Sequence, residues 1–127
     1  MERRKALFAI LKTATFAFVA RALVAEQEPL DALKIMPDTH KLLFENEFVR
    51  VIESKVPVGG FEPRHSHPRC VIVSLADFDA EIKTFPDENV TRVHRKFGAA
   101  SWSEATVHEV KIVGNNPSHN IRVELKR

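Results

Sequence analysis

The sequence has very little cysteine, with Cys70 the only one among 127 residues. A single cysteine excludes an intramolecular disulfide. A chain of this length is nevertheless able to bury a working core without disulfides or a structural metal. The length therefore predicts one domain that is stabilised by its own packing.

Residues 26–127 lack an excess of basic charge. The whole chain has a formal net charge of +2, but residues 1–25 contain five basic residues and one acidic residue, which leaves −2 for the remainder. A domain without basic excess argues against a nucleic-acid partner. The sequence also contains no Ser-His-Asp pattern, phosphate-binding loop or Cys-x-x-Cys pair, so it carries no motif for those chemistries.

The chain has no apolar run long enough to form a stable membrane span, because Lys12 and Arg21 interrupt the apolar residues of the N-terminus. Residues 1–25 begin with basic residues and end in small ones, which predicts an export signal and a periplasmic or secreted protein. The Arg3-Arg4 pair loosely resembles a twin-arginine signal. An amphipathic helix that stays attached, an organelle transit peptide and a cytoplasmic location remain open alternatives.

Beyond the N-terminus, the sequence predicts an all-β domain. Residues 26–39 contain Pro29 and Pro37 and are expected to form a linker with at most a short helical turn. Residues 40–127 consist of short runs rich in Val, Ile and Phe that alternate with turn residues, as in a barrel or sandwich. The expected strands are 48–54, 70–75, 78–85, 90–97, 107–113 and 121–125.

Two histidines stand one residue apart in the segment Gly59 to Val73, at the start of an apolar run. Residues two apart on a strand share a face, so His65 and His67 would point the same way. Their attachment points would lie roughly 6–7 Å apart, and both imidazoles would reach one metal ion at about 2.0–2.1 Å. The pair alone also fits two histidines on a solvated loop, so a third ligand is needed to establish a site.

At these residues the sequence resembles the small single-domain members of the cupin superfamily. Their first motif is a glycine, five spacers and His-x-His, which matches Gly59 to His67. A later stretch, from Gly98 through Trp102 to His108, is similar to the part of the second motif that supplies a further histidine. The resemblance covers residues 42–126. It implies a cupin-type jelly-roll β-barrel, with His65, His67 and His108 as ligands of a divalent transition metal.

The first motif normally also supplies a glutamate four or five residues after the second histidine. Those positions hold Val71 and Ile72 here. Without that carboxylate a bound ion loses one anionic ligand and keeps more positions open for water or substrate. Three imidazoles suit Fe, Zn, Mn, Ni or Cu, so the identity of the metal stays open. A decayed site that binds nothing is the alternative.

Four more residues are candidates for a substrate pocket beside the histidines. Arg69 and Val71 are in strand phase with His67, which predicts that they face inward. Trp102 and Glu104 precede His108 in the chain. Trp102 is either a packed aromatic or one that stacks on a substrate. Glu104 is either a solvated rim residue or an acid or base. We assign no site role to His40, His94 and His119.

The resemblance implies a protein that acts on a small organic molecule, with a metal-dependent oxygenase as the leading hypothesis. The alternative is a non-catalytic cupin that binds a metal or ligand through a reduced or vestigial site. The missing carboxylate and the lack of an evident general base favour that alternative. Cupins often pair through their barrels, so the resemblance also implies a possible homodimer.

Overall fold

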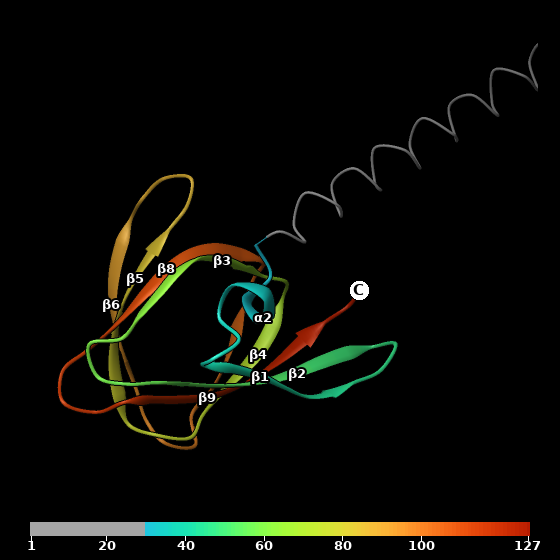
Figure 1. The fold of residues 1–127 in the computed structure, drawn as a ribbon, viewed down its shortest axis with the longest axis horizontal. Helices are drawn as coiled ribbons and strands as arrows, with labels where there is room; N and C mark the ends of the chain where they lie inside the picture. Colours follow the sequence, from blue (N-terminus) through green and yellow to red (C-terminus); the bar gives the residue numbers. More distant parts are fainter. Residues whose placement is uncertain (1–29) are drawn as a thin grey trace, which may run out of the picture.

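The computed structural model describes residues 30–127, which form two antiparallel sheets that face each other (Figure 1). The all-β prediction is confirmed. A short helix, α2 (Ala32–Ile35), precedes the strands. The strands of this part of the chain are β1 (His40–Glu45), β2 (Val49–Val56), β3 (Phe61–His67), β4 (Cys70–Ser74), β5 (Phe78–Thr84), β6 (Val90–Arg95), β7 (Ala100–Ser103), β8 (Thr106–Val113) and β9 (Ser118–Leu125).

The order of the strands in the sheets brings distant parts of the chain together. One sheet has the order β1-β2-β9-β4-β7 and the other β3-β8-β5-β6. The long pairings β2–β9, β4–β9, β3–β8 and β5–β8 all join strands that are not consecutive in the chain. Such antiparallel pairing between distant strands closes the two sheets over a common interior.

The interior has an apolar region and a polar region. The apolar cluster is built from strands β2, β5 and β8 and contains Val56, Phe78, Ala80, Val110 and Ile112, each at most 7% exposed. These residues supply the hydrophobic burial that stabilises the domain. The polar region consists of buried side chains and includes His40, Glu62, His65, His67, His108 and Glu124.

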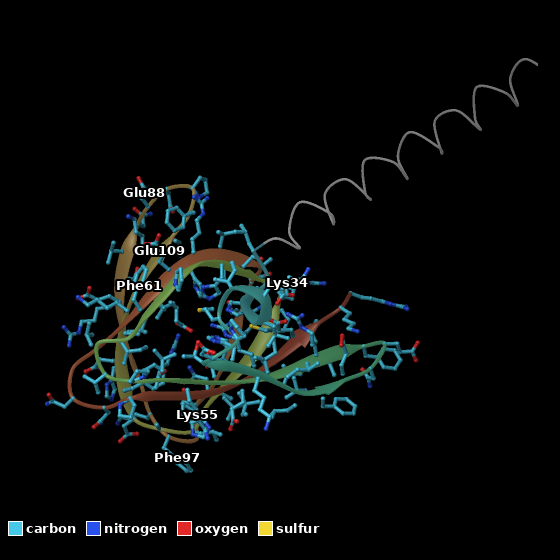
Figure 2. All side chains as sticks on the ribbon, viewed as in Figure 1. Lys34, Lys55, Phe61, Glu88, Phe97 and Glu109 are labelled. Carbon is cyan, nitrogen blue, oxygen red and sulfur yellow. The ribbon has the colours of Figure 1, made fainter. Side chains whose placement is uncertain are left out.

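All six expected strands are present, with shifts of up to three residues at their ends. Three further strands, β1, β3 and β7, were not among the expected ones, although the sequence placed the His65–His67 pair of β3 on a strand. β1 has consecutive exposed apolar residues, Leu42 to Phe44, and so lacks the alternation of a half-buried strand. Outside β1, Phe97 is another exposed apolar residue, 71% exposed at the outer edge of the molecule (Figure 2). β3 contains a proline and two histidines, and β7 is only four residues long. Neither strand has the β-branched composition that marks strands in a sequence.

The second half of the expected linker packs against the barrel. Asp31 caps α2 by accepting a hydrogen bond from the Leu33 N–H at 2.8 Å, and Ala32 and Met36 are buried. The packed domain therefore includes these residues. The expected export signal lies outside the described residues. Within residues 30–127, no helix has the length and apolar character that a membrane span requires.

Candidate metal centre

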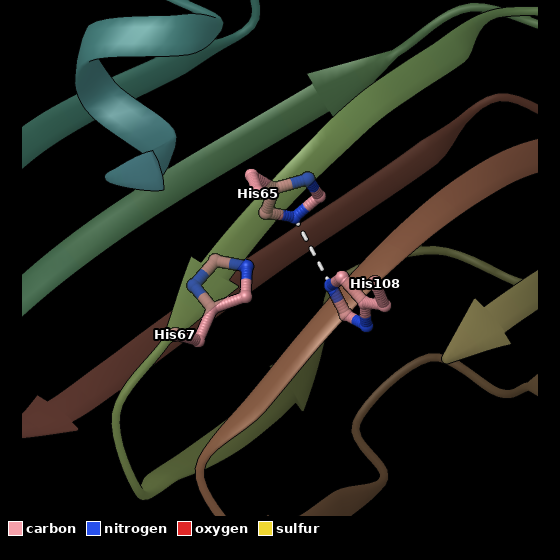
Figure 3. Close-up of side chains that lie close together, drawn as sticks. All are labelled: His65, His67 and His108. Carbon is pink, nitrogen blue, oxygen red and sulfur yellow. Dashed lines mark hydrogen bonds between the residues drawn. The ribbon is translucent and has the colours of Figure 1, made fainter. Parts of the chain in front are cut away.

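Three histidines from two neighbouring strands converge inside the barrel. His65 and His67 lie on one face of β3, and His65 is the direct cross-strand partner of His108 on β8. Cross-strand partners and residues two apart share a face, so all three rings point inward. They are 0%, 3% and 4% exposed. One ligand atom from each lies within 4.8 Å of the others, and the rings turn toward a common centre (Figure 3).

The tautomer of His65 is fixed by the backbone. Its Nδ1–H donates to the Pro63 carbonyl oxygen at 2.7 Å, which leaves Nε2 without a proton and directed at the centre. That Nε2 lies 3.0 Å from Nε2 of His108. Two ligands at right angles on an ion at 2.0–2.1 Å would be about 2.9 Å apart. The separation therefore suits both a hydrogen bond between the two rings and joint coordination of one ion.

The third histidine is held by a chain of buried charges. The Nδ1–H of His67 donates to Glu124 Oε2 at 2.8 Å. Arg50 donates from Nε and Nη2 to the other oxygen of Glu124 at 3.0 and 2.8 Å, and from Nη1 to Asp31 at 2.7 Å. Carboxylates that orient a metal-binding imidazole in this way raise its basicity and fix its free nitrogen toward the ion.

Burial keeps the three imidazoles neutral. Desolvation is the main cause that lowers the pKa of His65 and lowers that of His67 well below the ordinary value of 6.5. The pKa of His108 falls to about 3, first through burial and then through the neighbouring charges of His65 and Arg122. A neutral imidazole is the form that binds a metal ion. These histidines therefore have lone pairs available at neutral pH.

A bulge in β3 brings a carboxylate onto the same face. Glu62 pairs with Val110 and His65 with His108, so β3 has one residue more than β8 between these pairs. The extra residue places Glu62 and His65 on the same face although they are three apart. Glu62 is buried and lies 3.1 Å from Nε2 of His40, whose side chain is 1% exposed.

A cavity of about 40 Å³ is lined by His108 of the cluster and by residues of both sheets. Its polar lining comes mainly from Glu62, His108, Ser118, Asn120 and Arg122. The rest is largely apolar and includes Ile72 and Phe78. The space suits a small ligand, because one water molecule needs roughly 10–15 Å³ on the same measure.

The four expected pocket residues are absent from the lining of this cavity. Arg69 lies in the turn between β3 and β4 and is exposed. That turn resets the alternation, so Cys70 and Ile72 face inward and Val71 faces outward. The inward orientation expected for Val71 is therefore corrected. Trp102 pairs with Val71 on the outer face, 51% exposed, and donates to Glu104, which is also exposed.

Several residues of the site escaped sequence reasoning. Glu124, Arg122 and Asn120 alternate along β9 and share its inner face, where the apolar residues of a strand usually lie. The alternation itself was visible in the sequence, but a periodic pattern does not say which face is inside. The sequence already allowed Glu62 to lie near the metal but gave it no role, and its position follows from the bulge. Arg50 reaches the site through β2–β9 pairing, which only the folded chain shows.

The donor set fits a transition-metal ion. Three neutral imidazole nitrogens suit zinc, iron, nickel, copper or manganese, and three ligands leave further positions open. Both oxygens of Glu124 are occupied by Arg50 and His67, so this carboxylate supports a ligand and is not itself one. The cluster is thus able to hold a divalent ion.

No family model matches the sequence, and no curated protein matches it. Solved structures do match the fold. A cupin domain from Bordetella pertussis Tohama I has a TM-score of 0.63 at 22% identity, covering 69% of this chain and 92% of that chain. An RmlC-like cupin family protein with a double-stranded β-helix fold from Methanocaldococcus jannaschii has a TM-score of 0.54 at 14% identity, covering 68% and 77%.

A third match, a cupin superfamily protein from Desulfitobacterium hafniense DCB-2, has a TM-score of 0.51 at 11% identity, covering 68% of this chain and 74% of that chain. The expected jelly-roll barrel is confirmed: the chain has the cupin fold. More particularly, it is a small cupin-fold domain with three buried histidines close enough together to bind a metal.

Proposed function

We propose that this protein binds a divalent transition-metal ion through His65, His67 and His108 and uses it to act on a small organic molecule. The observation that carries the proposal is the convergence of three buried, neutral imidazoles. When bound, the ion would polarise an oxygen donor or activate dioxygen. A metal-dependent oxygenase is therefore our leading assignment.

Residues around the cluster would have distinct roles when an ion is bound. Pro63 and Glu124 orient two imidazoles, which spares the site the cost of ordering them when the ion binds. Glu62, which is buried beside His40, is the carboxylate that lines the cavity and is therefore the candidate general base.

A non-catalytic, metal- or ligand-binding domain is the second candidate. The lack of a carboxylate ligand at Val71 and Ile72 favours it, since β4 presents only Cys70, Ile72 and Ser74 to the interior. Oxygen consumption by iron-loaded protein in the presence of small organic acids separates the candidates. Metal binding without turnover would support the second.

The metal site is tested by replacing its ligands one at a time. We expect His65→Ala, His67→Ala and His108→Ala each to lose at least about tenfold in metal affinity, because two imidazoles hold an ion far less tightly than three. The measurement is metal content by mass spectrometry, followed by competition with a chelator.

His94→Ala is the matched control. His94 lies on β6 with its side chain 56% exposed and pairs with Asp79, away from the cluster. It should keep the metal content of the original protein. If the three ligand variants also keep that content, the proposed ligands are incorrect.

We further propose a homodimer formed through the outer face of the five-stranded sheet. An apolar row crosses all five strands in register and consists of Phe44, Val51, Val123, Val71 and Trp102. The row contains no charge, so two copies would meet without repulsion, as a two-fold contact requires.

We also propose that residues 1–25 serve as an export signal.

A further inference from the structure

Strand β9 presents polar side chains to the interior of the barrel. Its inner face carries Ser118, Asn120, Arg122 and Glu124, while Ile121 and Val123 lie on the opposite face. Arg122 is the cross-strand partner of Ile52 on one side and Ile72 on the other, and both of these isoleucines are buried. Its side chain therefore enters the interior between two apolar neighbours.

Arg122 forms no ion pair within residues 30–127, although the carboxylate of Glu124 lies near enough to interact with its charge. Glu124, two residues along, is already bound to Arg50 and His67, and Glu62 is bound to His40. Among residues 30–127, no carboxylate lies within ion-pair distance of Arg122, and its Nη1 donates to Sγ of Cys70 at 3.2 Å. A guanidinium that is partly removed from water and not paired is costly for the protein, and a bound anion removes that cost.

The guanidinium lines the same cavity as His108. Its positive charge contributes, after burial, to the lowered pKa of all three histidines. Asn120 lines the cavity too, and its Oδ1 accepts from Ser74 at 3.4 Å, which leaves its amide N–H groups available as donors. Arg95 adds a second cationic side chain to the lining. The polar wall of the cavity thus carries two guanidinium groups and amide donors, together with one carboxylate, Glu62, which is paired with His40.

We propose that Arg122 and Asn120 bind the carboxylate group of a small organic acid inside the barrel, next to the three histidines. The inference rests on the proposed function for the role of this acid as substrate or ligand. The planar guanidinium fork matches a carboxylate with two parallel hydrogen bonds. The 40 Å³ of space limits the acid to a few non-hydrogen atoms, in the size range of formate and acetate.

The test measures binding of acetate and of acetamide, which has nearly the same shape but no charge, by isothermal titration calorimetry with the zinc-loaded full chain. Acetate should bind about tenfold more tightly than acetamide or better, because hydrogen bonds to a charged group are the stronger ones. Equal affinity for the two probes would overturn the proposal.

Three variants assign the effect to the side chain. Arg122→Gln should weaken acetate binding about tenfold or more. Arg122→Lys, which keeps the charge but loses the fork, should weaken it less and guards against a folding defect of the first variant. Arg69→Gln removes one exposed positive charge outside the cavity and should bind acetate like the original protein. Unchanged acetate binding in both Arg122 variants would overturn the proposal.

Metal uptake, measured on the same samples, separates this inference from the proposed function. Arg122→Gln should keep its zinc, because the three histidines are intact and a repelling charge has been removed. If the original protein takes up no metal but prefers acetate through Arg122, the metal centre fails and the carboxylate site stands. If it takes up zinc without that preference, the carboxylate site alone fails.

Discussion

At the scale of single residues, Glu124 supplies a carboxylate beside the site where the motif glutamate is missing, as a hydrogen-bond partner of His67 and not as a metal ligand. The motif positions on β4 are Val71 and Ile72, and neither offers an oxygen ligand. Glu124 instead comes from β9, as the cross-strand partner of Cys70. Its carboxylate contacts His67, one of the three histidines of the cluster. Burial raises the pKa of Glu124, while Arg50 opposes that shift and favours the carboxylate.

Glu124→Gln tests this supporting role. The amide keeps the shape of the side chain but removes its charge, so His67 loses its strong acceptor and Arg50 loses one ion pair. Loss of such an outer partner typically lowers metal affinity about 10- to 100-fold. We expect a loss in this range, measured by competition with a chelator at pH 7.

Glu104→Gln provides the comparison. Glu104 is exposed and accepts a hydrogen bond from Trp102 outside the cavity, so its variant should bind metal normally. If Glu124→Gln also binds metal normally, the chain from His67 to Arg50 has only a structural role.

At the scale of elements, β9 joins the two surfaces on which the proposals depend. It pairs with β2 and β4 at the centre of the five-stranded sheet. Its inner residues line the cavity, and its outer residues, such as Val123, belong to the apolar row. Strand β1 forms the edge of the same sheet and extends with β2 as a hairpin (Figure 1). It exposes Leu43 by 46% and Phe44 by 53%.

Phe44→Lys tests the dimer. A lysine at the end of the apolar row would place a charge in an interface that otherwise excludes water, which is unfavourable on both copies of a two-fold contact. We expect the original protein to sediment as a dimer and the variant to shift toward the monomer, with at least a tenfold weaker association.

Phe97→Lys changes the same residue type at a more exposed position outside the row. It should leave the sedimentation of the dimer unaffected. A monomer at all concentrations of the original protein would contradict the dimer directly.

At the scale of the whole molecule, one interior contains both the apolar cluster and the histidine cluster. Keeping imidazoles neutral in this interior couples stability to pH. An imidazole with a lowered pKa binds fewer protons in the folded state than in the unfolded chain, between its folded pKa and about 6.5. The stabilisation is therefore complete above about pH 6.5 and is lost as pH falls toward the folded values, about 3 for His108.

We expect the metal-free protein to lose stability steeply between pH 6.5 and 5. Each histidine that stays neutral contributes about 1.4 kcal/mol per pH unit, so His67 and His108 together give roughly 2–3 kcal/mol per unit. Urea unfolding with a chelator present measures the slope. The raised pKa of Glu124 acts in the opposite direction from about pH 4.5 upward, because the folded state then binds the extra proton. Constant stability from pH 7 to 5 would contradict neutral, buried imidazoles.

The sequence by itself determined the all-β class, six of the nine strands of residues 30–127, and the three histidines that the fold brings together. These signals are local: alternation along a strand, turn residues between strands, and a short spaced motif. These signals hold in the folded chain because segments rich in β-branched residues favour the extended conformation whichever strands they pair with.

Only the tertiary structure decided which faces point inward. The turn at Arg69 reversed the phase expected for Val71, and the bulge in β3 turned Glu62 to the side of His65. The pairing of β9 with β2 and β4 brought Arg50, Arg122 and Glu124 to the site. The physical reason is the period of two in a strand: one inserted residue or one reset turn exchanges its faces, and the choice depends on distant partners.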